Sequence, residues 1–359
     1  MNAASRMDDG TPSAAPAAPP LVVRCGAFGD IVMLTTLVRL LHARHGRRVD
    51  VLASGPWTHD LLAPLPEVGT VHTVRSRNTP YLLCPSQWAA VRWLRGRGRG
   101  PVYVCDTDAP TLRLLRRAGL PDEDRVQRVR GDDEHAGVPR LWPDRWLRLG
   151  QRDPARAYPR AADVDAGAFR LPRLVVRDTD RDDLRRWRAA HGMEDAPCVL
   201  FQPGNKRTYK RGRLGAAGHD KHWPAAAWAG LAEAVWAELP EARIVLCGTP
   251  AEHGVLDDIH AAARRAPRML NAARELPVPR LLALLEQAHG MVSVDTGPAH
   301  AAAALGCPLV VMFGAAPPAK WRPIGPGPIR VLGGERGAAS RVGDLDVARV
   351  AAAWRALRA

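Results

Sequence analysis

Residues 291–314 (MVSVDTGPAHAAAALGCPLVVMFG) constrain the fold more than any other stretch of the chain. Two short apolar runs flank an alanine-rich segment, the pattern of a strand, a helix and a second strand. Thr296 is a suitable N-cap, Pro298 suits the first helical turn, and Gly306 suits the end of the helix. Since the helix carries the chain back across the sheet, the two strands are parallel. The stretch therefore predicts one unit of a parallel α/β sheet.

The turn between the first strand and the helix carries a carboxylate, a hydroxyl and a glycine, in Asp295, Thr296 and Gly297. A ligand at this turn would meet free backbone N–H groups and the positive end of the helix dipole, which suits phosphate. His300 lies in the first helical turn and can face the same crevice. Capped turns are common, so an ordinary strand–helix–strand unit is an equally good interpretation of this spacing alone.

The length of 359 residues favours about two domains, and 46% hydrophobic residues suffice for substantial cores. No run approaches the roughly 18–20 apolar residues of a membrane span. Residues 1–20 lack the apolar core of a signal peptide and are expected to form a disordered tail. The six cysteines form no CxxC pair, which favours buried reduced thiols in a cytoplasmic protein.

The net charge of +14 and pI of about 10.5 favour anionic partners, namely nucleic acid, phosphorylated substrates or an acidic membrane surface. Arginine supplies most of the charge, and a coding bias toward arginine explains it equally well. The chain has no RNP-like motif, zinc-finger spacing or basic-region heptad, so no specific nucleic-acid partner is expected.

The N-terminal half begins with an apolar strand, residues 21–25, that runs through a glycine-containing turn into a helix at residues 31–45. Gly29 lets the backbone approach a ligand closely, and Asp30 follows it. Asp30 is either a helix-start carboxylate that favours the dipole, or a functional carboxylate at the edge where open α/β sheets bind ligands. The glycines do not form the GxGxxG motif of dinucleotide sites. Strands and helices alternate beyond this point, as in a doubly wound sheet.

The C-terminal half repeats this pattern from a strand at residues 198–201. Gly204 and Asn205 follow the strand, and a basic loop is expected at 205–219, although it is not a Walker motif. Lys221 lies just before a predicted helix, where it is either a point charge for a diphosphate or a solvated lysine. The less regular segment 121–170 is an acceptor-side wall, an interdomain connection or a surface excursion.

The expected layout is therefore an α/β fold of two Rossmann-like domains that face each other across a cleft. The N-terminal, acceptor-binding domain covers residues 21–175, and the C-terminal, nucleotide-sugar-binding domain covers 176–340. Residues 341–359 form a helix that could pack back on the N-terminal domain. This layout is the GT-B arrangement of two-domain glycosyltransferases, with the ligand crevice between the carboxyl edges of the two sheets.

Three motifs resemble glycosyltransferase family 9, the ADP-heptose:lipopolysaccharide heptosyltransferases. They are Gly29-Asp30, the run Asp-Lys-His-Trp-Pro at 220–224, and Asp-Thr-Gly-Pro-Ala-His at 295–300. The similarity extends from about residue 21 to about residue 335, and the last motif is the most specific. One departure is the segment between Gly204 and Asp220, which is longer and more basic than expected for these enzymes.

The resemblance implies an inverting transfer of heptose from ADP-heptose to a lipopolysaccharide core or similar anionic glycolipid. Asp30 would be the general base. Lys221 and the N–H groups of Thr296 and Gly297 would stabilise the departing diphosphate. The resemblance also implies that Gly204, Asn205, Glu252, Asp295 and His300 contact the donor, with Glu252 at the ribose.

No metal or other cofactor is expected, and Asp106-Thr107-Asp108, although spelled like a metal-binding DxD motif, lies in the half away from the donor. The enzyme would work in the cytoplasm, in peripheral contact with the inner membrane. One alternative keeps the family but changes the sugar or the acceptor. The other is a non-catalytic basic module, which would bind polyanions in a salt-sensitive way and would not need Asp30 or His300.

Overall fold

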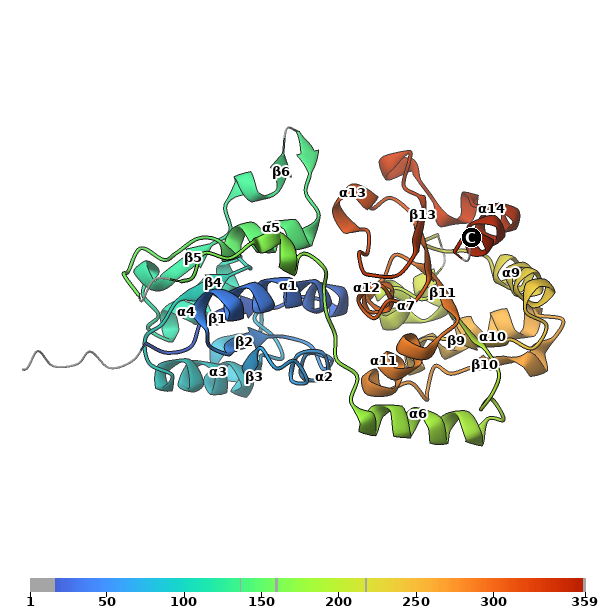
Figure 1. Ribbon diagram of the computed structural model, residues 1–359, viewed down its shortest axis with the longest axis horizontal. Helices are drawn as coiled ribbons and strands as arrows, with labels where there is room; N and C mark the ends of the chain where they lie inside the picture. Colours follow the sequence, from blue (N-terminus) through green and yellow to red (C-terminus); the bar gives the residue numbers. More distant parts are fainter. Residues whose placement is uncertain (1–16, 136, 159–160, 217, 358–359) are drawn as a thin grey trace, which may run out of the picture.

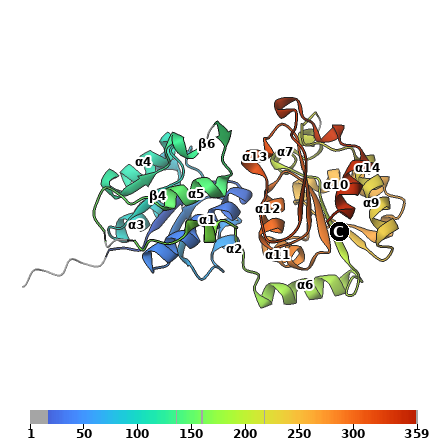
Figure 2. The same ribbon diagram turned by 45° about the horizontal axis from the view of Figure 1, so that its top comes forward.

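The computed structural model describes residues 17–135, 137–158, 161–216 and 218–357. The chain forms two lobes that lie side by side, each built on a parallel sheet covered by helices on both faces (Figures 1 and 2). The predicted α/β fold with two Rossmann-like domains is confirmed. The six cysteines are free and buried, as expected. In the described parts of the chain, no helix has the length and apolar character needed to cross a membrane.

The N-terminal sheet has the strand order β3-β2-β1-β4-β5. Its strands are β1 (Leu21–Arg24), β2 (Val49–Ala53), β3 (Val68–Thr73), β4 (Val102–Val104) and β5 (Arg125–Gln127). Its helices and 3-10 turns are α1 (Phe28–His45), α2 (Thr58–Leu62), η1 (Tyr81–Leu83), α3 (Pro85–Gly96), α4 (Ala109–Arg117), η2 (Asp122–Asp124), η3 (Arg130–Asp132), α5 (Trp142–Gly150) and η4 (Ala166–Phe169). Side chains of β1 alternate between two cores: Val22 packs with residues of α1, whereas Leu21 and Val23 pack with residues of α3 and α4.

The C-terminal sheet has the order β10-β9-β8-β11-β12-β13. Its strands are β8 (Cys198–Gln202), β9 (Arg243–Leu246), β10 (Met269–Asn271), β11 (Gly290–Val294), β12 (Leu309–Phe313) and β13 (Ile329–Gly333). Its helices and 3-10 turns are α6 (Asp178–Ala190), α7 (Lys206–Arg211), α8 (Arg213–Ala216), α9 (Ala225–Glu238), η5 (Pro250–Glu252), α10 (His253–Ala262), η6 (Ala266–Arg268), α11 (Val278–Gln287), α12 (Gly297–Ala304), α13 (Pro318–Trp321), η7 (Gly337–Ala339), η8 (Val342–Asp344) and α14 (Val347–Arg355). The predicted strand–helix–strand unit is β11-α12-β12.

The two lobes meet where α1 packs against α12, and the contact depends on two glycines. A Cβ atom on Gly297 would lie 2.8 Å from the Cβ of Phe28 and 3.0 Å from the backbone nitrogen of Gly29. A Cβ atom on Gly29 would lie 2.8 Å from the imidazole of His300. Any larger residue at either position would separate the two helices. The Gly29-Asp30 turn is therefore held directly against the Thr296-Gly297 turn of the other lobe.

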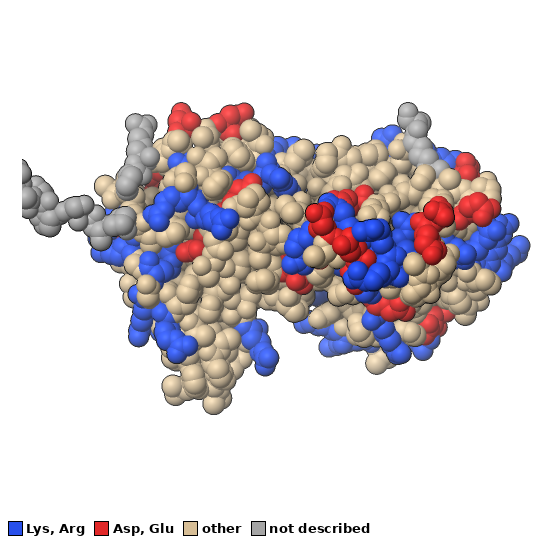
Figure 3. Space-filling model, turned by 60° about the horizontal axis from the view of Figure 1, so that its bottom comes forward, with Lys and Arg blue, Asp and Glu red and all other residues tan. Residues whose placement is uncertain are grey.

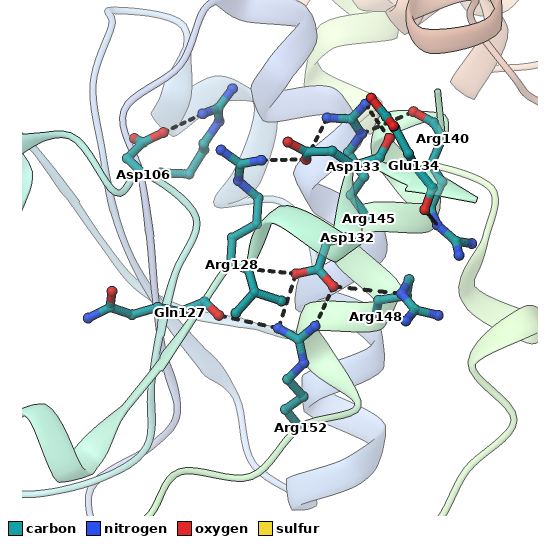
Figure 4. Close-up of polar contacts among 12 residues, drawn as sticks. Asp106, Gln127, Arg128, Asp132, Asp133, Glu134, Arg140, Arg145, Arg148 and Arg152 are labelled. Atoms are coloured by element: carbon teal, nitrogen blue, oxygen red, sulfur yellow. Dashed lines mark hydrogen bonds and ion pairs between the residues drawn. The ribbon is translucent and has the colours of Figure 1, made fainter. Parts of the chain in front are cut away.

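The segment 121–170 is part of the N-terminal lobe and is tied together by ion pairs (Figure 4). The buried carboxylate of Asp132 contacts Arg152, and Asp133 accepts a 2.8 Å hydrogen bond from the buried guanidinium of Arg145. The segment also includes the hairpin of β6 (Glu134–His135) and β7 (Val138–Pro139). It reaches the other lobe, since Trp142 packs against Trp321 of α13 in a tilted arrangement with ring centroids 5.2 Å apart. Buried charges require such partners, which explains the density of arginine and aspartate here.

Three segments differ from the expectations of the sequence. The expected loop at 205–219 contains the helices α7 and α8, because Asn205 caps α7 by accepting from the backbone N–H of Arg207. The C-terminal helix α14 packs against α9 and the second sheet, and therefore lies on its own lobe. The expected tail lies outside the described residues except for 17–20, where the backbone N–H of Ala18 donates to the carbonyl of Arg99.

Candidate active site

A cavity of about 630 Å³ lies between the two lobes, at the carboxyl edges of both sheets. Loops after β1 and β2 form one wall, and loops after β8, β9 and β11 form the other. This is where open α/β sheets bind ligands. Of the residues singled out from the sequence, six line it: Gly29, Gly204, Asn205, Glu252, Thr296 and Gly297.

The C-terminal wall is organised around Glu252, which is 3% exposed. Its carboxylate accepts a 2.6 Å hydrogen bond from the hydroxyl of Thr208, and it accepts from both the backbone N–H and the hydroxyl of Thr249, at 2.9 and 2.8 Å. Only glycine fits at position 204 beside this carboxylate, because a Cβ atom there would lie 1.9 Å from Oε1 of Glu252. A carboxylate has about four acceptor positions, so Glu252 keeps room for a ligand hydroxyl.

Lys221 and Asp295 form an ion pair next to this wall. The ammonium of Lys221 donates to Oδ2 of Asp295 at 2.6 Å and to its backbone carbonyl at 2.8 Å. Neither residue lines the cavity, and the two side chains are 20% and 10% exposed. Thr296, the next residue, is the N-cap of α12, but its side chain makes no capping hydrogen bond. The predicted residues of this motif therefore come together, with Thr296 and Gly297 closest to the cavity.

His300, in α12, is buried at the contact between the two lobes, next to Gly29. Burial lowers the pKa of His300; the carboxylates of Asp295 and Asp30 oppose this effect and Lys221 reinforces it. His300 is consequently neutral at pH 7. A Cβ atom on Gly29 would lie 2.8 Å from the imidazole of His300, and Lys221 pairs with Asp295, so the structure brings the three sequence motifs together.

Asp30 is held by its own turn and by an arginine from the preceding strand. Its carboxylate accepts from the backbone N–H of Ala27 at 2.8 Å and pairs with Arg24 at 2.9 Å. The same guanidinium contacts Asp106, which also accepts from the backbone N–H of Cys25 at 2.5 Å. Burial lowers the pKa of Arg24, but Asp30 and Asp106 outweigh it and raise the pKa, so Arg24 stays charged.

The same arrangement gives Asp106-Thr107-Asp108 a structural role, which the sequence analysis did not predict. Asp106 faces Arg24, and Asp108 pairs with Arg77 at 2.5 Å, so both carboxylates are engaged by arginines. In the described ranges, no group of three or more His, Cys, Asp or Glu side chains is placed to hold a metal ion. Asp106 therefore belongs to the support of the Asp30 turn.

The sequence analysis did not single out several residues that line the cavity: Trp57 and Arg75 from the N-terminal lobe, and Lys206, Tyr209 and Lys210 from α7. Lys206 and Lys210 are four residues apart and thus share one helix face. That spacing, together with Asn205 as an N-cap and Thr208 three residues later, would have predicted α7. Trp57 and Arg75 follow β2 and β3, and their place at the cavity depends on the sheet order.

Comparisons with known proteins identify the C-terminal lobe. Residues 180–348 match the model of glycosyltransferase family 9 (heptosyltransferase). This part of the chain therefore belongs to that family. The resemblance to glycosyltransferase family 9 that the three motifs indicated is confirmed, and the protein is a glycosyltransferase.

Relatives and solved structures extend the similarity over both lobes. The chain is 25% identical over 304 residues to lipopolysaccharide heptosyltransferase 2 of Escherichia coli K12, and 24% identical over 314 residues to the protein of the same name from Salmonella typhimurium. Each alignment covers 83% of this chain and 83% of the relative. The structure of E. coli ADP-heptose LPS heptosyltransferase II superposes with a TM-score of 0.71 at 23% identity, over 94% of this chain and 98% of that one. This likeness shows the GT-B fold.

Proposed function

We propose that this glycosyltransferase transfers a heptose from ADP-heptose to a lipopolysaccharide core or similar anionic glycolipid, with inversion and without a metal ion. The observation that supports this most is the cavity between the lobes, which is lined by Gly29 on one side and by Glu252, Thr296 and Gly297 on the other. Asp30 does not line the cavity itself but follows Gly29 directly in the chain. The names of the relatives support the sugar and the acceptor.

In the proposed reaction, Asp30 takes the proton of the acceptor hydroxyl. The oxygen then bonds to the anomeric carbon as the bond from that carbon to the diphosphate oxygen breaks, which inverts the configuration. Arg24 orients the carboxylate of Asp30, since it contacts Oδ1 at 2.9 Å. Proton transfer by a positioned carboxylate contributes about 10²–10⁴-fold to the rate.

The negative charge that develops on the departing diphosphate needs cations and N–H donors. Lys221 and the N–H groups of Thr296 and Gly297 take this role in the proposal. Lys221 already contacts Asp295 at 2.6 Å, so a bound diphosphate would share the ammonium with that carboxylate. Gly204 and Asn205 pass close to the nucleotide, and Glu252 accepts from its ribose. Asp295 and His300 shape the sugar side of the donor site.

The decisive experiment is a thermal-shift and turnover screen of nucleotide sugars. ADP-heptose should stabilise the protein, since a ligand that binds only the folded state raises its stability, whereas UDP- and GDP-sugars should not. Stabilisation and turnover by a different nucleotide sugar would point to another family 9 reaction. Salt-sensitive binding to polyanions without any turnover would instead support a non-catalytic module. The proposal also places the enzyme in the cytoplasm, at the inner face of the inner membrane.

A further inference from the structure

One face of the N-terminal lobe combines exposed apolar side chains with exposed arginines that form no ion pair among the described residues. Leu82 and Leu83, in the 3-10 turn η1, are 78% and 74% exposed, and Trp88 of α3 is 44% exposed. Burying such side chains is favourable, so an exposed cluster of this kind marks a contact site more often than single exposed residues do. We call the surface formed by η1, α3 and α4 the η1 face.

The apolar part of the η1 face is one contiguous, braced structure. The indole N–H of Trp88 donates to the carbonyl of Tyr81 at 2.6 Å, which joins η1 to α3. The guanidinium of Arg117, from α4, lies 4.7 Å from the ring centre of Tyr81. Arg95 of α3 donates to the carbonyl of Arg117 at 2.7 Å. The two leucines are therefore presented on a turn that is braced by α3 and flanked by the guanidinium of Arg117.

The charge of the η1 face has one sign. Helices α3 and α4 contain no aspartate or glutamate. Their exposed arginines form no ion pair with any carboxylate of the described residues: Arg92, Arg95, Arg113, Arg116 and Arg117. The long helix α6 differs, because its Arg181 pairs with Glu286 at 2.7 Å. Figure 3 shows the same contrast, with mostly basic residues on the N-terminal half and interleaved signs on the other.

From this geometry we infer that the η1 face docks on a membrane surface rich in anionic phospholipid. Leu82, Leu83 and Trp88 enter the interface, and the arginines contact the headgroups. Apolar anchors and basic residues without acidic neighbours fit this partner, whereas a nucleic acid would leave the leucines without a role.

The position of the η1 face also fits the acceptor. Arg75, which lines the cavity, begins the loop that leads to η1, and its backbone N–H donates to the hydroxyl of Ser86 in α3 at 3.1 Å. A glycolipid whose acyl chains stay in the bilayer could thus present its sugar at the N-terminal wall of the cavity. This part of the inference rests on the proposed function, because it assumes a glycolipid acceptor.

The test is co-sedimentation of the full chain with vesicles of mixed phosphatidylglycerol and phosphatidylcholine, and with vesicles of phosphatidylcholine alone. The wild type should bind the anionic vesicles. The double change Leu82→Ser/Leu83→Ser should weaken this binding about tenfold or more. The double change Arg92→Gln/Arg116→Gln should weaken it about thirtyfold, since each arginine near an anionic surface is worth about fivefold in affinity.

Matched controls replace side chains of the same types, leucine and arginine, on the C-terminal lobe. Leu214→Ser changes a leucine that is 86% exposed, and Arg264→Gln/Arg274→Gln removes two exposed arginines that pair with no carboxylate in the part of the chain that the structure describes. Both controls should bind vesicles like the wild type. Equal losses in controls and η1 variants would overturn the inference, because general charge or hydrophobicity would then explain the binding. It would also be overturned if the wild type bound RNA but no vesicles, or if the leucine changes abolished a dimer and left vesicle binding intact.

Transfer assays separate this inference from the proposed function. With a water-soluble, delipidated acceptor, the η1 variants should turn over ADP-heptose like the wild type, whereas with vesicle-embedded acceptor they should be slower. Vesicle binding that depends on the η1 face, without transfer to any acceptor, would refute the proposed function but support the docking surface. Normal transfer with no vesicle binding would refute the docking surface alone.

Discussion

Replacing Gly204 with alanine would test how the nucleotide wall of the cavity is built. The new Cβ would lie 1.9 Å from Oε1 of Glu252, and carbon and oxygen in contact need about 3.3 Å. The carboxylate would have to retreat by more than about 1 Å, which breaks its 2.6 Å hydrogen bond from Thr208. Because Glu252 is only 3% exposed, bulk solvent does not screen the loss of that hydrogen bond.

The expected cost follows from that one hydrogen bond. A hydrogen bond to a charged group contributes about 1.5–3 kcal/mol, and a domain of this size loses about 2–4 °C in Tm per kcal/mol. Gly204→Ala should therefore lower the Tm of the C-terminal lobe by roughly 3–12 °C in calorimetry. It should also weaken ADP binding about tenfold or more by titration calorimetry, because Glu252 can no longer meet the ribose from its native position.

Gly96→Ala is the matched control, because its added Cβ would have no described atom within 4 Å apart from its own helix and chain neighbours, and its φ is not positive. In a helix this change should be neutral or stabilise by up to about 1 kcal/mol. The clash should also disappear in a Glu252→Ala background, where Gly204→Ala should cost little more. A Gly204→Ala protein with the wild-type Tm and ADP affinity would refute the reasoning, as would an undiminished cost in the Glu252→Ala background.

Three further predictions concern the motifs around His300. Asp30→Asn should lower kcat by about 10²-fold or more while the Kd for ADP-heptose stays unchanged; near-normal turnover would remove Asp30 from the mechanism. Lys221→Met should weaken binding of ADP more than binding of AMP in calorimetry, because the second phosphate adds the charge that the ammonium meets; an unchanged ratio would contradict this role. Burial lowers the pKa of His300 from its ordinary value of 6.5. As the pH falls, this imidazole therefore takes up a proton in the unfolded chain before it does so in the folded protein. The free energy of unfolding then decreases below about pH 6.5, by up to about 1.4 kcal/mol per pH unit. His300→Asn should reduce that decline in urea unfolding at pH 7 and pH 5, and an equally steep decline in the variant would assign it to other groups.

Local signals in the sequence were enough to predict the fold class and the turns of the site. The strand–helix–strand unit at 291–314 follows from short apolar runs, an N-cap and a helix-ending glycine, all of which act within a few residues. The Gly29-Asp30 turn is equally local. The basic stretch after Asn205 was predicted wrongly as a loop, because its six-residue helix α7 is too short to show a clear apolar period and only the capping residues Asn205 and Thr208 signal it.

The tertiary structure alone decided which charges meet. Arg24 contacts Asp106 from 82 residues away, and Lys221 reaches Asp295 across 74 residues. Neither pairing leaves a signal in local periodicity, because it depends on the order of strands in a sheet and on the contact between the lobes. The same holds for Glu252, whose neighbour Gly204 lies on another strand's loop. The sequence by itself thus determined the turns that carry the reactive groups, and the packing of α1 on α12 determined that they share one site.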